Sequence, residues 1–240
     1  MLRFKLTDNS KVKFKQKHYN TFSLTQGSIK EGGTCPGMTE GSEGCQEKCY
    51  DRGLRRLYKN YASSEDYNTS LVLTKNNKEI YTVIKNSITY WLLTSAVTPP
   101  YFRIHTGGDF YNQQYAKAWA EVMQEYSDIK FWAYTRSMFA VPILAKVKNL
   151  TLYLSCDNVN KDKVFKTYDK YKNLPNIALA WMGNELPSEF PKDRELLVCP
   201  EVTNKIANTK IQGACSRCRA CIDRPLKTGN MRHIRFPIHR

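Results

Sequence analysis

The sequence predicts an α/β fold in which strands and helices alternate around a parallel sheet. Runs rich in aromatic and β-branched residues alternate with helix-like runs through the middle of the chain. The helix-like runs carry apolar residues at spacings of three and four, which is the pattern of an amphipathic helix. Each strand-like run ends in small, polar or charged residues, and the reactive edge of α/β folds lies where parallel strands end.

The individual elements follow from these patterns in chain order. A first strand over residues 22–29 leads into a glycine-rich loop. A helix is expected next, because Leu54, Leu57, Tyr58 and Tyr61 repeat at helical spacing. The later elements are a helix over 78–93, a strand over 101–106, a helix over 115–126, a strand over 130–135, a helix over 139–147, a strand over 150–155, a helix over 161–172 and a strand over 176–182.

Length and composition limit the class of protein. The chain has 240 residues, which suits one large domain or two small ones. Hydrophobic residues make up 41% of it, and this excludes a wholly disordered chain. No run approaches the ~18 consecutive apolar residues of a membrane helix, and the first residues lack the apolar core of a signal peptide. We therefore expect a cytoplasmic protein with no membrane-spanning helix.

The formal net charge of +15 is concentrated at the two ends of the chain. Residues 1–30 contain seven Lys and Arg against one acidic residue, and residues 205–240 contain nine against one. The part between them is nearly neutral. Basic ends of this kind either bind the phosphates of a nucleotide or nucleic acid, or balance an anionic group held nearby.

Four cysteines near the C-terminus have the spacing of metal ligands. Cys215, Cys218 and Cys221 form a C-x2-C-x2-C run, and Cys199, which precedes a proline, lies sixteen residues upstream. The bacterial ferredoxin run begins with the same spacing, whereas zinc sites usually pair cysteines in separated C-x2-C units. This C-terminal cysteine group therefore favours a [4Fe–4S] cluster, with structural zinc as the alternative.

Cys35, Cys45 and Cys49 form an N-terminal cysteine group with C-x9-C-x3-C spacing. If the following helix reaches back to Cys45, the last two thiols lie on one helical face. Three ligands leave one metal position open to a small molecule, whereas a closed structural site needs four. The alternative is that Cys156 supplies a fourth ligand and closes the site.

Further candidate site residues come from the ends of the predicted strands. They are His105, Gly107, Gly108 and Asp109 after one strand, Arg136 after the next, and Ser155 and Asp157 after the third. Because the carboxyl ends of parallel strands meet at one edge, we expect these residues to converge with the N-terminal cysteine group. The alternative for each residue is an ordinary turn or helix-capping role.

These motifs resemble two families. The segments TCPG, CxxxCY, FRIHTGGDFY, FxAYTRS and SCD, with the final CxxCxxC and FPIHR, are similar to a phage family called gene product eighty-eight, over residues 22–240. Three cysteines after a first strand and a Gly-Gly-acid turn after a later one more distantly resemble the radical S-adenosylmethionine (SAM) enzymes. That resemblance implies a partial (β/α) barrel over residues 1–198 and a C-terminal cysteine-rich extension with an auxiliary iron–sulfur cluster over 199–240.

The radical SAM resemblance also implies a cofactor and a reaction. The N-terminal cysteine group would hold a [4Fe–4S] cluster whose fourth iron binds the amino and carboxylate groups of SAM, and Gly107, Gly108 and Asp109 would contact the methionine amino group. Reduction by a host electron donor such as flavodoxin or ferredoxin would release a 5′-deoxyadenosyl radical. The radical would act on a nucleotide or nucleic-acid substrate in the host cytoplasm. The substrate pocket would be lined by the catalytic candidates Arg136, Asp157, His105 and Ser155.

A second hypothesis is a non-catalytic nucleic-acid-binding phage protein, stabilised by zinc or by inert iron–sulfur clusters. It explains the basic ends directly, and the 12% aromatic content suits it because aromatic side chains stack on bases. It does not explain why polar strand ends should meet at one edge. The sequence therefore favours the enzyme.

Overall fold

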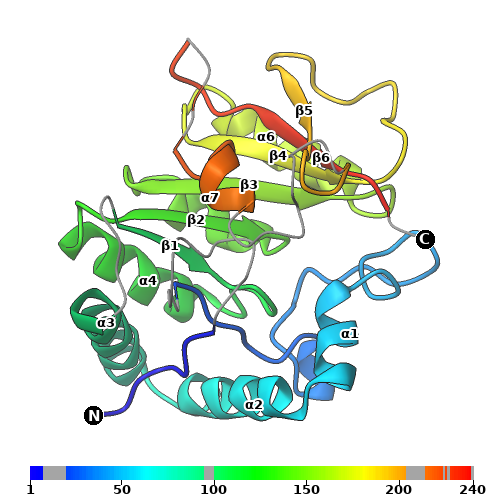
Figure 1. Ribbon diagram of the computed structural model, residues 1–240. Coiled ribbons are helices and arrows are strands. Elements are labelled where there is room, and N and C mark those ends of the chain that lie inside the picture. Colours follow the sequence, from blue (N-terminus) through cyan, green and yellow to red (C-terminus); the bar gives the residue numbers. More distant parts are fainter. Residues whose placement is uncertain (8–19, 95–99, 204–213, 224, 226–227, 239–240) are drawn as a thin grey trace.

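The centre of the molecule is a sheet of six parallel strands in the spatial order β1-β2-β3-β4-β6-β5 (Figure 1). The computed structural model describes residues 1–7, 20–94, 100–203, 214–223, 225 and 228–238. The strands are β1 Tyr101–Ile104, β2 Lys130–Thr135, β3 Leu150–Cys156, β4 Ile177–Met182, β5 Leu196–Val198 and β6 His233–Phe236. The predicted α/β fold with a parallel sheet is confirmed.

The first predicted strand is a short segment at the edge of this sheet. Residues 20–24 run parallel to β1, where Arg103 N donates to Asn20 O at 2.9 Å and Leu24 N donates to Gly107 O at 3.0 Å. The pairing begins earlier and ends sooner than the sequence predicted. It leads the chain into the loop that carries the N-terminal cysteine group.

The helices lie between the strands and before them. They are α1 Tyr50–Leu57, α2 Lys59–Leu73, α3 Asn77–Thr94, α4 Gln113–Glu125, α5 Val141–Leu144, α6 Lys161–Tyr171 and α7 Ala214–Cys218. The helix predicted around Leu54–Tyr61 is divided, because Tyr58 has an extended backbone between α1 and α2. No helix in the described part of the chain is long and apolar enough to cross a membrane.

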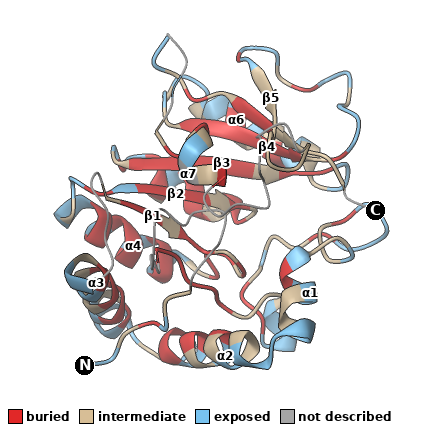
Figure 2. Ribbon diagram, viewed as in Figure 1, coloured by how far each residue is buried: buried red, intermediate tan, exposed pale blue. Residues whose placement is uncertain are grey.

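The two faces of the sheet have different partners. On one face, Phe102, Phe131 and Leu152 pack with side chains of α3, α4 and α6 in the main hydrophobic core. On the other face, Trp132 packs against Ile222, which follows α7. Figure 2 shows β2, β3, β4 and much of α4 as buried, whereas β5 is intermediate and α1 is largely exposed. Because successive side chains of a strand point to opposite faces, this division decides which residues reach the site.

The segment after residue 198 belongs to the central sheet. Strand β6 lies between β4 and β5, and Thr151 Oγ1 of β3 donates to Ile222 O at 2.9 Å. Figure 1 shows α7 in front of the strands. Residues 199–240, which the sequence analysis predicted as a C-terminal extension, therefore contribute strand β6 to the sheet. Residues after α7 pack against one face of it.

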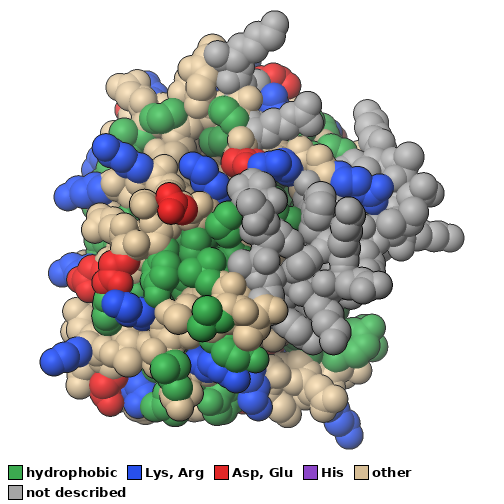
Figure 3. All heavy atoms as spheres, turned by 60° about the vertical axis from the view of Figure 1, so that its left-hand side comes forward, with side chains coloured by type: hydrophobic (Ala, Val, Ile, Leu, Met, Phe, Trp, Pro, Cys, Tyr) green, Lys and Arg blue, Asp and Glu red, His purple; other side chains and the backbone are tan. Residues whose placement is uncertain are grey.

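Charged side chains are mixed on the face that Figure 3 presents. Lys and Arg are interspersed there with Asp and Glu, and hydrophobic side chains gather near the centre. Much of the two basic chain ends, including residues 8–19 and 204–213, lies outside the described residues.

Candidate functional site

A cavity of about 1200 Å³ lies along the face of the sheet opposite the main core and extends over the carboxyl ends of the strands. Seven of the eight cysteines line it: Cys35, Cys45, Cys49, Cys199, Cys215, Cys218 and Cys221. The two cysteine groups are far apart in the sequence, and the fold brings them to the same cavity.

The loop that carries the N-terminal cysteine group rests on the strand ends. A Cβ at Gly37 would lie 2.1 Å from Arg136 O, so a side chain there would clash with the backbone. Thr39 Oγ1 donates to Asp157 Oδ2 at 2.7 Å and accepts from Cys45 N at 2.7 Å. These contacts hold the loop over the ends of β2 and β3.

The expectation that Cys45 and Cys49 share a helical face is wrong. Helix α1 begins at Tyr50, and Cys49 is its N-cap with an extended backbone. Cys45 lies in a preceding turn, whose Gln46 N donates to Thr39 O at 3.0 Å. The hydrogen bonds of Thr39 therefore shape this turn in place of a first helical turn.

Electrostatic interactions join the thiols of the N-terminal group. Burial raises the pKa of the Cys35 thiol, and negative charge on Asp109, Cys49 and Cys45 raises it further. Burial is also the main cause that raises the pKa of Cys49, with a contribution from Cys45. Metal binding to these thiols would therefore release protons.

The thiols of the C-terminal cysteine group also interact electrostatically with one another. Burial raises the pKa of Cys221, and the charges of Cys215, Cys199 and Cys218 raise it further against a hydrogen bond from Tyr134 that lowers it. Within the described ranges, however, no three His, Cys, Asp or Glu side chains converge as ligands of one metal ion.

Asp109 joins the ends of β1 and β2. Its carboxylate accepts from Thr135 Oγ1 at 2.6 Å, from Phe110 N at 2.7 Å and from Arg136 N at 2.8 Å. Burial raises the pKa of Asp109, and these hydrogen bonds act in the opposite direction. Asp109 lines the cavity, but its carboxylate is largely engaged by the protein itself.

Arg136 and Asp157 form a buried ion pair with 2.7 Å between Nη1 and Oδ2. The Asp157 side chain is 1% exposed, and its Oδ1 also accepts from the N–H groups of Val159 and Asn160. Arg136 lines the cavity, whereas Asp157 is not part of the cavity wall. Asp157 therefore positions Arg136 and the cysteine loop.

Strand alternation separates Ser155 from Cys156. Ser155 lines the cavity. Cys156 lies in the main core on the opposite face, where its thiol donates to Ala180 O at 3.6 Å and burial raises its pKa to about 12. Cys156 is therefore not placed to be a fourth ligand of the N-terminal group.

His105 belongs to an aromatic cluster. Its ring centroid lies 5.2 Å from that of Phe22 and 4.9 Å from that of Phe110, and its Nε2 lies 2.9 Å from Tyr115 Oη. Burial lowers the pKa of His105 to about 3, and the charge of Arg103 contributes. The imidazole is therefore neutral at neutral pH and unsuited to act as a general acid.

Two further cavity residues were not predicted. Asp51 is 1% exposed and packs against Gly107, where a Cβ would lie 2.1 Å from Asp51 Oδ2. Arg103 lies in the middle of β1 and donates to Tyr50 Oη at 3.2 Å. A charged residue between Phe102 and Ile104 is a signal that could have identified Arg103, whereas Asp51 had no comparable signal.

Asp51 and Glu65 form a buried carboxyl pair beside the N-terminal group. Burial raises the pKa of both, and the charge of Asp51 helps to raise that of Glu65 to about 9. Tyr61 also donates to Asp51 Oδ1. Each carboxyl of the pair therefore ionises less readily than a free one, while Arg55, 3.2 Å from Glu65 Oε2, acts in the opposite direction.

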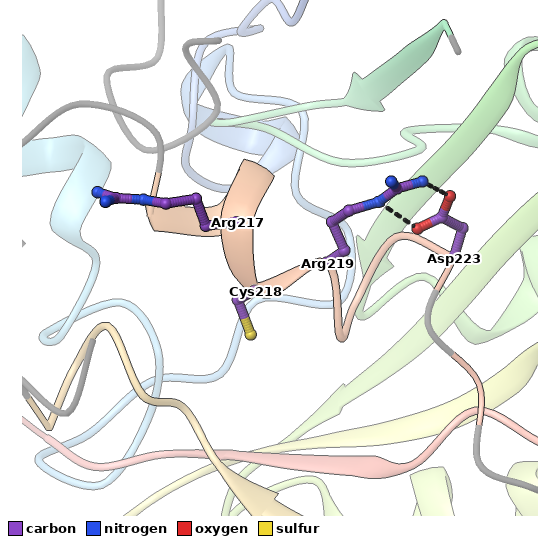
Figure 4. A pocket seen from close by; sticks show the side chains of 4 residues that line it. All are labelled: Arg217, Cys218, Arg219 and Asp223. Carbon is purple, nitrogen blue, oxygen red and sulfur yellow. Dashed lines mark hydrogen bonds and ion pairs between the residues drawn. The ribbon is translucent and has the colours of Figure 1, made fainter. Parts of the chain in front are cut away.

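A smaller hollow of about 370 Å³ lies beside α7 and is lined by Arg217, Cys218, Arg219 and Asp223. Arg219 Nε donates to Asp223 Oδ1 at 2.8 Å, and Figure 4 shows the Cys218 thiol pointing away from this pair. Since Cys218 also lines the large cavity, the large cavity is the better candidate site.

The family model described as Gene product 88 matches residues 2–224. The chain belongs to the Gene product 88 family. It is 31% identical over 211 residues to the Gene 88 protein of Mycobacterium phage D29, which covers 85% of this chain and 83% of that protein. It is 29% identical over 209 residues to the Gene 88 protein of Mycobacterium phage L5, with the same coverage. No solved structure matches the chain.

The Gene product 88 match includes both cysteine groups and ends before β6. The predicted resemblance to this phage family is confirmed, and the chain is similar to phage proteins over most of its length. The resemblance to radical SAM enzymes stays a prediction.

Proposed function

We propose that this Gene product 88 chain is an iron–sulfur enzyme of radical SAM type that acts on a phosphate-bearing substrate such as a nucleotide or nucleic acid. The observation that carries the proposal is the cavity lined by both cysteine groups at the carboxyl ends of a parallel sheet. An enzyme needs such a cavity to orient a substrate and exclude water.

The order of elements supports the radical SAM part of the proposal. The segment 20–24 pairs with β1, and β1 to β4 follow one another in sheet order, all parallel. The main helical core covers one face of the sheet, and the cavity lies on the other. This arrangement suits a partial (β/α) barrel with its site inside, in which residues 199–240 supply an auxiliary cluster site.

The donor set fits a polynuclear cluster better than a single ion. Thiolates around one zinc ion, at Zn–S distances of about 2.3 Å, must converge closely. In a [4Fe–4S] cluster each thiolate binds a different iron, so the thiols lie farther from one another than they do around a single zinc ion. The counts of three thiols in the N-terminal group and four in the C-terminal group match a cluster with one open iron and a fully ligated cluster.

Two features differ from the usual radical SAM pattern. The spacing here is C-x9-C-x3-C in place of C-x3-C-x2-C, and the acidic residue of the turn is Asp109 in place of Glu. The nine-residue gap forms the part of the loop in which Thr39 binds Asp157, so the longer spacing serves to attach the loop to β3. Asp109 is tied to β2, so we assign it the role of holding the turn beside Cys35.

In the proposed enzyme, the bound cofactors supply the reductive cleavage of SAM that starts radical chemistry. The protein positions the reacting groups and shields them from water. Asp157 and Thr39 fix Arg136 and the cysteine loop, while the segment after α7 covers the sheet face over Trp132. An electron donor such as a host flavodoxin or ferredoxin completes the system.

The test is EPR spectroscopy of anaerobically purified, dithionite-reduced protein, with and without SAM. The proposal expects a reduced-cluster signal that changes when SAM is added, because SAM would bind the open iron. The change should persist in Cys156→Ser and disappear in Cys35→Ser, which serve as matched cysteine variants.

Two results would contradict the proposal. A cluster signal indifferent to SAM would remove the SAM chemistry. A colourless protein that contains zinc and gives no EPR signal would favour the alternative, a non-catalytic nucleic-acid-binding protein.

A further inference from the structure

Arg103 is a cation of the cavity wall, and its hydrogen-bond partners within the described part of the chain are uncharged. Its Nε donates to His105 O at 3.1 Å and its Nη2 donates to Tyr50 Oη at 3.2 Å. Its Cζ lies 5.4 Å from the ring centroid of Tyr134. A tyrosine has an ordinary pKa of about 10, and burial raises that of Tyr134 further, so both phenols are neutral at neutral pH.

The position of Arg103 lies between the two cysteine groups. Its partner Tyr50 directly follows Cys49 of the N-terminal group. On the other side, its guanidinium interacts electrostatically with Cys215 of the C-terminal group. In the sheet, Arg103 is in register with Trp132 of β2, which also lines the cavity. A group bound to Arg103 would therefore lie between the two sets of thiols.

Other arginines of the cavity wall are already neutralised. Arg136 pairs with Asp157 at 2.7 Å, and Arg219 pairs with Asp223 at 2.8 Å. Among the residues that the structure describes, none accepts a hydrogen bond from Arg103 Nη1. Arg103 thus differs from them in keeping donors available.

A guanidinium stays ionised in proteins. The Asp51 carboxyl interacts with Arg103 electrostatically, but no carboxylate among the described residues forms a direct ion pair with it. The fork of N–H donors fits the two oxygens of a carboxylate or a phosphate. We infer that Arg103 binds an oxyanion of the substrate, a phosphate or carboxylate group, and so holds the substrate between the two cysteine groups. This inference rests on the proposed function, because it assigns the ligand as that enzyme's substrate.

The test is isothermal titration calorimetry on the anaerobically purified protein at constant ionic strength. Inorganic pyrophosphate is the phosphate probe and citrate is the carboxylate probe. We expect saturable binding of one probe to the wild type, and that probe identifies the oxyanion class. Arg103→Gln should weaken the binding at least tenfold, and Arg103→Lys should weaken it less, because lysine keeps the charge and loses the fork.

Arg219→Gln is the matched control, since Arg219 lines the same cavity but pairs with Asp223. It should change the affinity less than twofold. Equal affinities in wild type and Arg103→Gln, equal losses in Arg103→Gln and Arg219→Gln, or no binding of either probe to the wild type would each overturn the inference. The titration contains neither SAM nor reductant, so its failure is distinct from a failure of the EPR test.

Discussion

Gly37→Ala tests whether close backbone packing holds the N-terminal cysteine group over the strand ends. The new Cβ would lie 2.1 Å from Arg136 O and 2.5 Å from Arg136 C, whereas ordinary contact begins at 3.4 Å. The loop must therefore move by about 1.3 Å, or the end of β2 must yield. Gly37 does not have a positive φ, so the cost is steric alone.

Overpacking of this kind costs about 1–3 kcal/mol. For a chain of this size each kcal/mol lowers the Tm by about 2–4 °C, which gives a decrease of about 2–12 °C. Movement of the loop should also expose Cys35 and accelerate its reaction with a thiol reagent. The measurements are thermal unfolding by circular dichroism and the rate of thiol modification in metal-free protein.

Gly53→Ala is the matched control from the same region. Gly53 lies inside α1, and a Cβ there would meet no atom within 4 Å. Alanine should raise the free energy of unfolding by up to about 1 kcal/mol, because it is the better helix former. The reasoning is refuted if Gly37→Ala unfolds at the wild-type temperature and its thiols react at the wild-type rate.

Three further predictions concern the surroundings of the site. Cys156→Ser should not change the amount of iron bound per chain after anaerobic reconstitution, because Cys156 faces the main core. A loss of iron in this variant would show that Cys156 is a ligand. Arg194→Met should lower the free energy of unfolding, measured in urea, by about 3 kcal/mol, because Arg194 donates to five backbone carbonyls. A decrease below about 1 kcal/mol would argue against this role. Burial lowers the pKa of His233 to about 4, so the unfolded chain binds a proton more readily than the folded one below pH 6.5. Stability should therefore fall by up to about 3 kcal/mol as the pH drops from 6.5 to 4, and His233→Gln should flatten this dependence in urea unfolding; an equally steep loss in that variant would assign the effect elsewhere.

Elements with a clear hydrophobic period could be predicted from the sequence. The bounds of β2 match the prediction, and those of α3 differ by one residue at each end. Strands β5 and β6 were missed: β5 has only three residues, and β6 lies in a basic segment, HIRF, without a run of apolar residues around it. Their pairing also joins segments that are distant in the chain, and local pattern does not report such contacts.

The orientation of Cys156 was available from the sequence and was left open. Leu150, Leu152 and Leu154 alternate with polar and aromatic residues, and Cys156 continues the leucine series. Since a strand alternates its faces with a period of two, Cys156 had to share the buried face of these leucines. The same alternation assigns Ser155 to the opposite face, on the cavity.

Residue types and their spacing were enough to predict the parallel α/β class, the division of the cysteines into two groups and the strand ends that carry polar residues. The tertiary structure was needed to show that both groups line one cavity. It also decided that Asp109 and Asp157 bind the protein's own groups, and that Arg103 keeps donors for a ligand. The physical reason is that residue type and spacing fix local conformation and chemistry, whereas the availability of a charge depends on which distant groups the fold brings within hydrogen-bonding distance.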